Sequence, residues 1–193
     1  MSIIHSHHVK LTAVAGTCRI VLRPVTDDDI PLLCALNSDP EALRWADDNA
    51  EPYDEARVKG IWGYVSPMAY CFIVEADDVP IGDCWLQRMN LPEIQSLYPK
   101  GTDVRRIDMS IGKTAYWNRG IGTTMIRCLT DFAFREENVD VLHCMCNEEN
   151  IRSVRVWEKN GFRLKLQKPR EGTDRFENHY VLTRETYFAN QME

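Results

Sequence analysis

Apolar and polar residues alternate along this chain with a period of two in several short segments, as they do in half-buried β-strands. The predicted strands are 18–24, 69–75, 79–89, 104–111, 141–146, 162–167 and 179–183. Asp77 and Asp78 separate the second strand from the third, so we expect a tight turn to join these two strands as a hairpin.

Segments with helical spacing separate these strands. Between 122 and 138, Met125, Leu129 and Phe132 recur every three or four residues, which predicts a long helix with one buried face. The other predicted helices are 26–37, a short turn from Pro40, 55–64 and 151–160, the last ended by Gly161. Two prolines within 91–102 predict a loop there. Strands that alternate with helices indicate an α/β protein.

The most informative stretch runs from a predicted strand at 107–112 through a glycine-bearing loop into the long helix. Amides in the first turn of a helix have no internal acceptors, and a glycine lets the backbone approach a ligand. Each amide donated to an anionic oxygen contributes about 1.5–3 kcal/mol, against roughly 0.3–1 kcal/mol from the helix dipole. The loop is therefore predicted to bind a pyrophosphate, although a plain helix entry has the same pattern. It is not a dinucleotide fingerprint, because Met125 replaces the third glycine.

The two glycines of this loop, Gly120 and Gly122, match the Arg/Gln-x-x-Gly-x-Gly/Ala loop of the GNAT superfamily of N-acetyltransferases, with Trp117 in the Arg/Gln position. A second segment, 150–162, resembles the Asn-x-x-Ala/Ser and Tyr-Glu-Lys-x-Gly-Phe signature of that family, with Trp157 in place of the tyrosine. The two motifs stand in the order that the family has.

The resemblance covers about residues 18–183 and implies a fold, a domain and a cofactor. The family fold has a single central mixed sheet, largely antiparallel, which is flanked by helices and splayed between its fourth and fifth core strands. Residues 18–193 would form one such domain, and residues 1–17 an N-terminal extension that is an extra strand or disordered. Acetyl-CoA is the implied co-substrate, and an amine attacks its thioester directly in a ternary complex without a metal. The residues implied to bind the coenzyme are Met109, Ser110, Ile111, Trp117, Asn118, Arg119, Gly120, Ile121, Gly122, Thr123, Asn150, Ser153 and Trp157.

Asp108 is the first predicted catalytic residue. The stretch 79–123 looks like the aminoglycoside 6'-N-acetyltransferases, in which an aspartate at this strand position lies beside the attacking amine. A carboxylate there can hold the ammonium and accept or relay its proton. An ordinary aspartate has a pKa of about 3.9 and is a poor base unless burial raises that pKa, so relay through water is an equal alternative. A surface or turn-capping aspartate is the remaining alternative.

Trp157 leaves the acid of the reaction unassigned. In the family a tyrosine at this position is thought to protonate the departing thiolate, whereas an indole has no proton to give near neutral pH. Tyr116 is the predicted substitute, with a bound water or an unprotonated thiolate as alternatives.

The net charge of −6 favours a cationic partner and disfavours nucleic acid. The residues predicted to line the acceptor pocket are Trp45, Asp47, Asp48, Asp54, Asp83 and Asp108. A solvated acidic surface is the alternative for each acid taken singly. The expected acceptor is a small-molecule cationic amine.

Length and composition exclude several other classes of protein. The 193 residues, 44% of them hydrophobic, are enough for one domain with one core. Without a long apolar run or a signal peptide, the protein is expected in the cytoplasm and away from membranes. Seven scattered cysteines indicate buried, reduced thiols. His143, Cys144 and Cys146 are interpreted as a core strand and not as a metal site, because the histidine points away from the cysteines.

Three functions follow from this reasoning. The leading one is acetylation of the 6'-amine of an aminoglycoside, which confers antibiotic resistance. The second is acetylation of another amine, such as a protein N-terminus, a polyamine or a metabolite. The third is a coenzyme-binding module without catalysis, which Trp157 suggests. The protein is expected to be a monomer or a homodimer.

Overall fold

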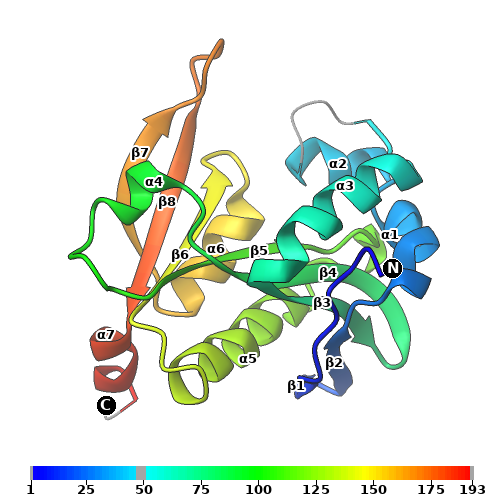
Figure 1. Cartoon of the computed structure of the whole chain (residues 1–193), viewed down its shortest axis with the longest axis horizontal. Coiled ribbons are helices and arrows are strands. Elements are labelled where there is room, and N and C mark those ends of the chain that lie inside the picture. The colour runs from blue at the N-terminus through cyan, green and yellow to red at the C-terminus, as the bar shows by residue number, and fades with distance from the viewer. Residues whose placement is uncertain (1, 47–50, 192–193) are drawn as a thin grey trace.

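Eight strands form one continuous sheet in the computed structural model, which describes residues 2–46 and 51–191 (Figure 1). The strands are β1 Leu11–Ala15, β2 Cys18–Pro24, β3 Ala69–Ala76, β4 Val79–Arg88, β5 Val104–Ser110, β6 Val141–Asn147, β7 Arg163–Pro169 and β8 Phe176–Thr183. They lie in the order β1-β2-β3-β4-β5-β6-β8-β7, and every neighbouring pair is antiparallel except β5 and β6. The predicted α/β fold with a mixed, largely antiparallel sheet is confirmed.

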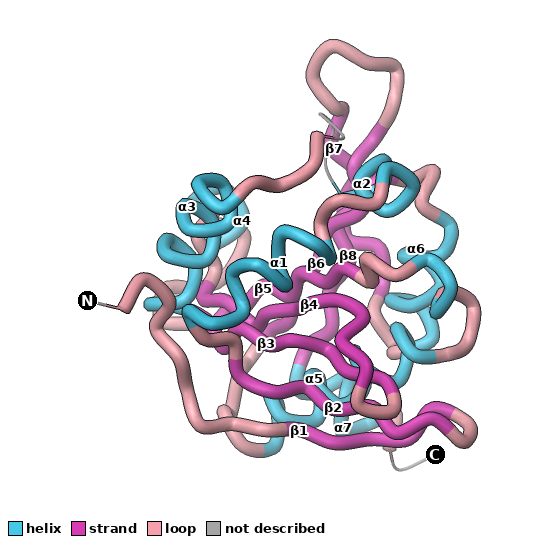
Figure 2. The backbone as a smooth tube through the Cα atoms, turned by 90° about the vertical axis from the view of Figure 1, so that its right-hand side faces the viewer, coloured by secondary structure: helices cyan, strands magenta, loops and turns pink. Residues whose placement is uncertain are grey.

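Helices cover both faces of the sheet (Figure 2). On one face lie α1 (Ile30–Leu36) and α3 (Glu55–Val65), with α2 (Pro40–Ala46) beyond them. On the other face α5 (Ile121–Arg135) packs against β1 and β2, and α6 (Ile151–Lys159) packs beside α5. The remaining helical segments are α4 Pro92–Gln95, α7 Arg184–Ala189 and the 3₁₀ turns Asp27–Asp29, Ser66–Met68 and Thr114–Tyr116.

Alternation along the strands builds a core on each face. Leu22 and Phe72 belong to the core that α5 covers, whereas Cys71 and Ile73 belong to the core under α1 and α3. The helix predicted at 122–138 buries Met125, Leu129 and Phe132, as its spacing indicates.

The sheet forks between β5 and β6. These strands pair only at Val104–Arg106 opposite Val141–His143, and beyond that point β5 pairs with β4 alone. The Val104 carbonyl faces β4, where it accepts from the Met89 amide at 3.0 Å. Because successive residues of a strand direct their amide groups to opposite neighbours, the amides of Ile107 and Met109 face the fork. The predicted splay between the fourth and fifth core strands is confirmed, counting from β2.

The N-terminal extension lies against the domain. Leu11–Ala15 form β1 at the sheet edge, paired with β2. Ahead of β1, Ile4 is buried and its amide donates to the Asp27 carboxylate at 2.8 Å. His7 Nε2 lies 3.0 Å from the Cys71 carbonyl, so the extension contacts β3 as well.

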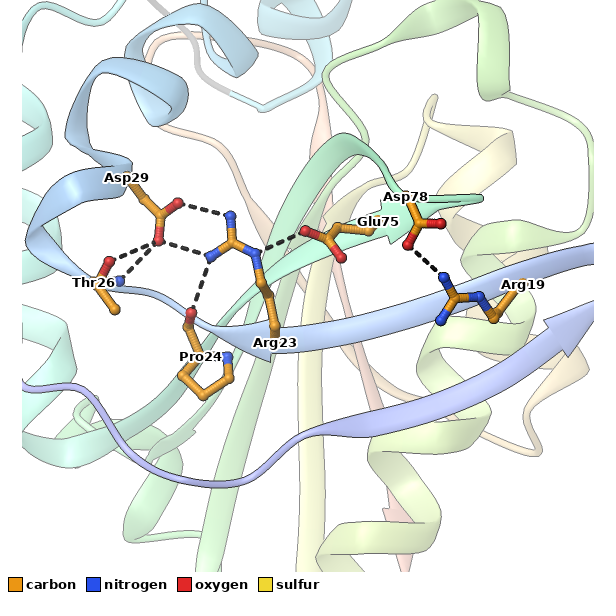
Figure 3. Close-up of polar contacts among 7 residues, drawn as sticks. All are labelled: Arg19, Arg23, Pro24, Thr26, Asp29, Glu75 and Asp78. Carbon is orange, nitrogen blue, oxygen red and sulfur yellow. Dashed lines mark hydrogen bonds and ion pairs between the residues drawn. The ribbon is translucent and has the colours of Figure 1, made fainter.

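Arg23 joins β2 to its neighbours (Figure 3). Its guanidinium donates to Asp29 at 2.7 and 2.9 Å and to Glu75 on β3 at 2.8 Å. Asp29 also accepts from the Thr26 amide at 2.9 Å and closes a capping box ahead of α1. These contacts hold the start of α1 against the sheet.

Two helices lie where the sequence analysis predicted none. The loop prediction is wrong for Pro92–Gln95, because Pro92 starts a helical turn without needing an amide donor and the Gln95 amide donates to the Leu91 carbonyl at 3.0 Å. After β8, the Thr183 side chain accepts from the Thr186 amide at 3.2 Å and starts α7. Tyr187 then packs against Phe134 of α5.

Candidate active site

A cavity of about 380 Å³, here called the donor cavity, lies between the end of β5, the loop that follows it, α5 and α6. Of the residues predicted to bind the coenzyme, those that line it are Met109, Ser110, Ile111, Trp117, Asn118, Gly120, Ile121, Gly122, Thr123, Asn150 and Ser153. Tyr116 and Trp45 line it too. Arg119 and Trp157 are not among the lining residues; the Arg119 guanidinium lies 5.2 Å from the centre of the Tyr116 ring.

The loop before α5 exposes helix amides to this cavity. Gly120 caps α5 in a left-handed conformation, with φ of 77°, and its carbonyl accepts from the Thr124 amide at 3.0 Å. The amides of Ile121, Gly122 and Thr123 belong to the first turn, which offers them no intrahelical acceptor. They are therefore available to an anion.

Trp117 ties this loop to the end of β5. Its indole N–H donates to the Ile111 carbonyl at 2.7 Å, and the Arg152 guanidinium lies 3.9 Å from the centre of its ring. Trp117 thus links the loop that carries Gly120 to the residue after β5 and to α6.

The sequence analysis missed three cations on the wall of the donor cavity. Arg152, Arg155 and Lys159 line it from α6. Their spacing of three and four residues places them on one helix face, and this pattern was visible in the predicted helix 151–160. A cationic wall opposite free helix amides suits a polyanionic ligand.

A second cavity of about 260 Å³, here called the acceptor cavity, is lined by Asn37 at the end of α1, by Ile61 and Trp62 of α3, and by residues of β4 and β5. Its walls include Asn37, Tyr53, Trp62, Trp85 and Asp108. The two cavities share the lining residues Trp45, Met109, Ser110, Asn150 and Ser153. They meet where β5 and β6 separate.

Asp108 enters the acceptor cavity with both carboxylate oxygens hydrogen-bonded. Arg106 donates to them at 2.6 and 2.7 Å, and the Trp85 indole N–H donates to Oδ2 at 2.8 Å. The two ionised side chains are 20% and 26% exposed, so the pair is partly shielded from water. Arg106 and Asp108 stand two apart on one strand, which points both to the same face.

Asp83 lines the acceptor cavity from β4 and is only 4% exposed. The Asn37 side-chain amide lies 3.4 Å from its carboxyl. Burial raises the pKa of Asp83 to about 7 and the negative charge of Asp108 adds to this rise, whereas the contact with Asn37 opposes it. A carboxyl group with a pKa near 7 gains or loses its proton near neutral pH.

Trp157 lies in the wall of the acceptor cavity and is buried against Phe162. Its indole N–H donates to the Ser153 hydroxyl at 3.0 Å, and the Ser153 amide donates to the Asn150 side chain that caps α6. Asn150 and Ser153 therefore have structural partners as well as a place beside both cavities.

The other predicted acceptor residues are spread more widely. Trp45 lines both cavities. Asp54 caps α3 by accepting from the Arg57 amide at 2.8 Å and is not among the residues that line either cavity. Asp47 and Asp48 lie outside the described residues.

A third and larger hollow of about 960 Å³ adjoins the acceptor cavity at Trp45, Arg106 and Met145. The charged residues along it are Arg44, Glu93, Arg106, Glu149, Lys168, Arg170, Glu171, Arg175 and Glu177. Lys168 pairs with Glu93 at 3.4 Å and Arg175 with Glu149 at 3.1 Å. Within the described ranges this outer hollow carries both signs of charge, which differs from the acidic surface that the net charge suggested.

The histidine and cysteine segment of β6 lies inside the protein. His143 is buried, and its Nε2 lies 2.9 Å from His179 Nδ1. Burial lowers the pKa of His143 to about 4. In the part of the chain that the structure describes, no three His, Cys, Asp or Glu side chains are grouped to hold a metal, and no helix has the length and apolar character needed to cross a membrane.

Comparison with known proteins gives a consistent result. A family model described as an acetyltransferase (GNAT) domain matches residues 19–163. A kanamycin resistance protein of Rhizobium radiobacter is 32% identical over 59 residues, which are 31% of this chain and 55% of that protein, so the match spans about half the length of this relative. Aminoglycoside N(6')-acetyltransferase type 1 of Klebsiella pneumoniae is 23% identical over 150 residues, 74% of this chain and 73% of that protein.

Solved structures share the fold. AAC(6')-Ib in complex with ribostamycin and coenzyme A superimposes with a TM-score of 0.70 at 21% identity, over 88% of this chain and 96% of that one. Spermidine N-acetyltransferase from Vibrio cholerae, in complex with coenzyme A and spermine, gives 0.69 at 17% identity, over 88% and 98% of the two chains.

Proposed function

The chain belongs to the acetyltransferase (GNAT) family, and from this premise we propose that it moves an acetyl group from acetyl-CoA to the primary amine of a cationic small molecule, with the 6'-amine of an aminoglycoside as the first candidate. The junction of the two cavities at the fork of the sheet carries this proposal. A thioester in the donor cavity and an amine in the acceptor cavity would meet beside Met109 and Ser110.

On the donor side, the free amides of Ile121–Thr123 and the cations of α6 would hold the diphosphate of the coenzyme. The Met109 amide faces the fork, so it can donate to the thioester carbonyl oxygen as that oxygen gains negative charge. The two cavities would also hold the thioester and the amine close together in a fixed orientation, which contributes to the rate enhancement. No metal is needed for direct attack of an amine on a thioester.

On the acceptor side, the aromatic walls and the carboxyl groups of Asp83 and Asp108 suit an ammonium group. The two relatives reported above are named for kanamycin resistance and for aminoglycoside acetylation, which supports an aminoglycoside. The acceptor cavity is small, so one amine-bearing ring would enter it while the rest of the molecule lies in the outer hollow.

The charge of the outer hollow favours a second candidate. Arg44, Lys168 and Arg175 would attract a carboxylate as readily as Glu93 and Glu149 would attract an ammonium. An acceptor with both groups, such as a peptide with a free N-terminus, fits this balance.

An acceptor screen tests the proposal. Thiol release from acetyl-CoA is measured with kanamycin A, neamine, spermidine and a short peptide, and the acetylated position is read by mass spectrometry. Release with kanamycin A or neamine supports the first candidate, and release with the peptide alone replaces it by the second. Binding of acetyl-CoA in calorimetry without release to any amine would overturn the catalytic proposal.

A further inference from the structure

We propose that Asp83 is the residue that accepts the proton of the acceptor amine, and that Asp108 positions that amine. The inference rests on the proposed acetyl transfer and adds a catalytic residue to it. It moves the base from β5 to the neighbouring strand β4.

The strand register places both carboxyl groups in one cavity. Asp83 lies directly opposite Ser110 in the antiparallel β4–β5 ladder, and Trp85 lies opposite Asp108. Residues two apart on a strand share a face, and side chains directly opposite each other have Cβ atoms about 4.5–5.5 Å apart. Ser110 also lines the donor cavity, so Asp83 stands across the ladder from the point where the two cavities join.

The hydrogen bonds of Asp108 leave it poorly placed to take a proton. Arg106 and Trp85 direct three donors at its two oxygens, at 2.6, 2.7 and 2.8 Å. Both carboxylate oxygens are therefore already occupied by hydrogen-bond donors, two of them from a guanidinium. A proton added to Asp108 would displace one of these donors and leave Arg106 without its counter-charge.

Asp83 has the opposite environment. No cation among the described residues pairs with it, and the Asn37 amide is at the long distance of 3.4 Å. The charged and titratable groups around the acceptor cavity are Arg106 and Asp108 from β5, Tyr53 ahead of α3, and Cys146 from β6; the Cys71 thiol of β3 is also near Asp83. Burial and the negative charge of Asp108 raise the pKa of Asp83 to about 7, against the opposing effect of the hydrogen bond from Asn37.

Active sites often contain two neighbouring carboxyl groups in different environments. One of them then accepts the proton and the other positions the substrate. A base is most effective when its pKa lies near the working pH, because it is then both available as the carboxylate and strong enough to take the proton. Asp83 meets this condition by its place in the cavity wall.

The cavity is also built for a polar occupant. The indole N–H of Trp62 is buried and has no hydrogen-bond acceptor in the part of the chain that the structure describes. Trp62 meets Trp85 edge to face at 5.7 Å between ring centres, so two aromatic walls stand beside the Asp83 carboxyl. An ammonium group in this cavity would lie near the aromatic rings and the carboxyl groups of its wall.

The proton balance of the step is simple. The acceptor arrives as an ammonium and loses two protons in becoming an amide. The Asp83 carboxylate takes one of them and frees the nitrogen lone pair, which forms the N–C bond to the thioester carbonyl carbon. The C–S bond breaks, its electron pair leaves on sulfur, and the resulting thiolate takes the second proton. Asp83 then releases its proton to water.

Kinetics over a range of pH test the assignment. The full chain, its Asp83→Asn variant and its Asp108→Asn variant are assayed with saturating acetyl-CoA and with neamine or spermidine between pH 5.5 and 9. We expect the wild-type kcat to rise with pH around 7. Asp83→Asn should lower kcat by about 10²–10⁴-fold and abolish this rise with little change in KM. Asp108→Asn should mainly raise KM and keep the rise. An Asp83→Asn enzyme with kcat within threefold of wild type would overturn the inference.

A second measurement tests the role of Asp83 even if neither amine is acetylated. Failure to acetylate neamine and spermidine would count against these acceptors and not against the role of Asp83. In protein labelled with carbon-13, one aspartate carboxyl resonance should be missing from Asp83→Asn, and in the wild type it should titrate near pH 7. Ethylammonium, used as the probe, should lower this midpoint, and tetramethylammonium, which has no N–H to donate, should change it less. A midpoint below 5, or the same midpoint with and without ethylammonium, would overturn the inference.

Discussion

Replacing Asp83 with asparagine should stabilise the protein, and the gain should grow with pH. Burial raises the pKa of Asp83 from 3.8 to about 7, so between these values the folded protein keeps a proton that the unfolded chain has lost. Raising the pH then favours the unfolded chain, and stability falls through this window. A shift of about three pH units corresponds to about 4 kcal/mol above pH 7, because each unit is worth about 1.4 kcal/mol.

Part of this loss of folding free energy is already present at pH 5, because an aspartate in the unfolded chain is mostly ionised at that pH. By the linkage relation, Asp83 destabilises the folded protein by about 1.7 kcal/mol at pH 5. The destabilisation grows by a further 2–3 kcal/mol, roughly, between pH 5 and pH 9. Urea unfolding of both proteins at pH 5, 7 and 9 measures the difference, in which the contributions of other groups largely cancel. The free-energy advantage of Asp83→Asn should widen by about 2–3 kcal/mol over this range. An advantage that stays constant or shrinks would refute the reasoning.

Asp29→Asn provides a control of opposite sign. Burial by itself raises the pKa of Asp29, but the hydrogen bonds from Arg23 and Thr26 outweigh it and hold the pKa below the ordinary value. Such a group stabilises the fold above its unfolded pKa, and this stability is lost as the pH falls through the folded pKa. Asp29→Asn should therefore be less stable than wild type at pH 7, and the deficit should shrink below about pH 4.

Three further predictions concern the donor cavity and the fork. Gly120→Ala should weaken acetyl-CoA binding in calorimetry at least several-fold, because a φ of 77° strains an alanine by about 1 kcal/mol in the loop proposed to bind the diphosphate. Gly101→Ala is the control: its φ is 94° and its surroundings are equally open, so it should lose similar stability but bind acetyl-CoA as the wild type does. Arg155→Gln should weaken coenzyme A binding and reduce its dependence on salt, and equal salt dependence in both proteins would contradict a cationic wall. Trp157→Phe should lower the free energy of unfolding by about 1 kcal/mol through the lost hydrogen bond to Ser153 and leave the pH dependence of kcat in place; loss of that dependence would instead give the indole a part in proton transfer.

Much of the fold was predictable because its signals are local. The alternation in the strands, the buried face of α5 and the Asp77–Asp78 turn each depend on a few consecutive residues. The turn of α4 escaped prediction because two prolines in twelve residues suggest a loop, although a proline is well suited to the first position of a helix. The start of α7 depends on one capping threonine.

The candidate site was less predictable because its chemistry depends on register. Arg106 and Asp108 share a strand face, but the sequence analysis did not predict the ion pair that joins them. The alignment of β4 with β5 places Trp85 beside Asp108 and Asp83 opposite Ser110, and the sequence alone does not give this alignment. The depth of Asp83 depends further on α1 and its cap Asn37, which no pattern in the sequence connects to β4.

Because β5 and β6 share only three residue pairs, few interstrand hydrogen bonds join the two halves of the sheet. Over the rest of β5, the edge that faces β6 has no strand paired with it among the described residues. A molecule lodged between the two strands, with amide groups along its length, would restore part of that ladder. Acetyl-CoA bound there, as proposed, would be a reactant and also a link between β5 and β6, and its departure should speed amide hydrogen exchange along both strands.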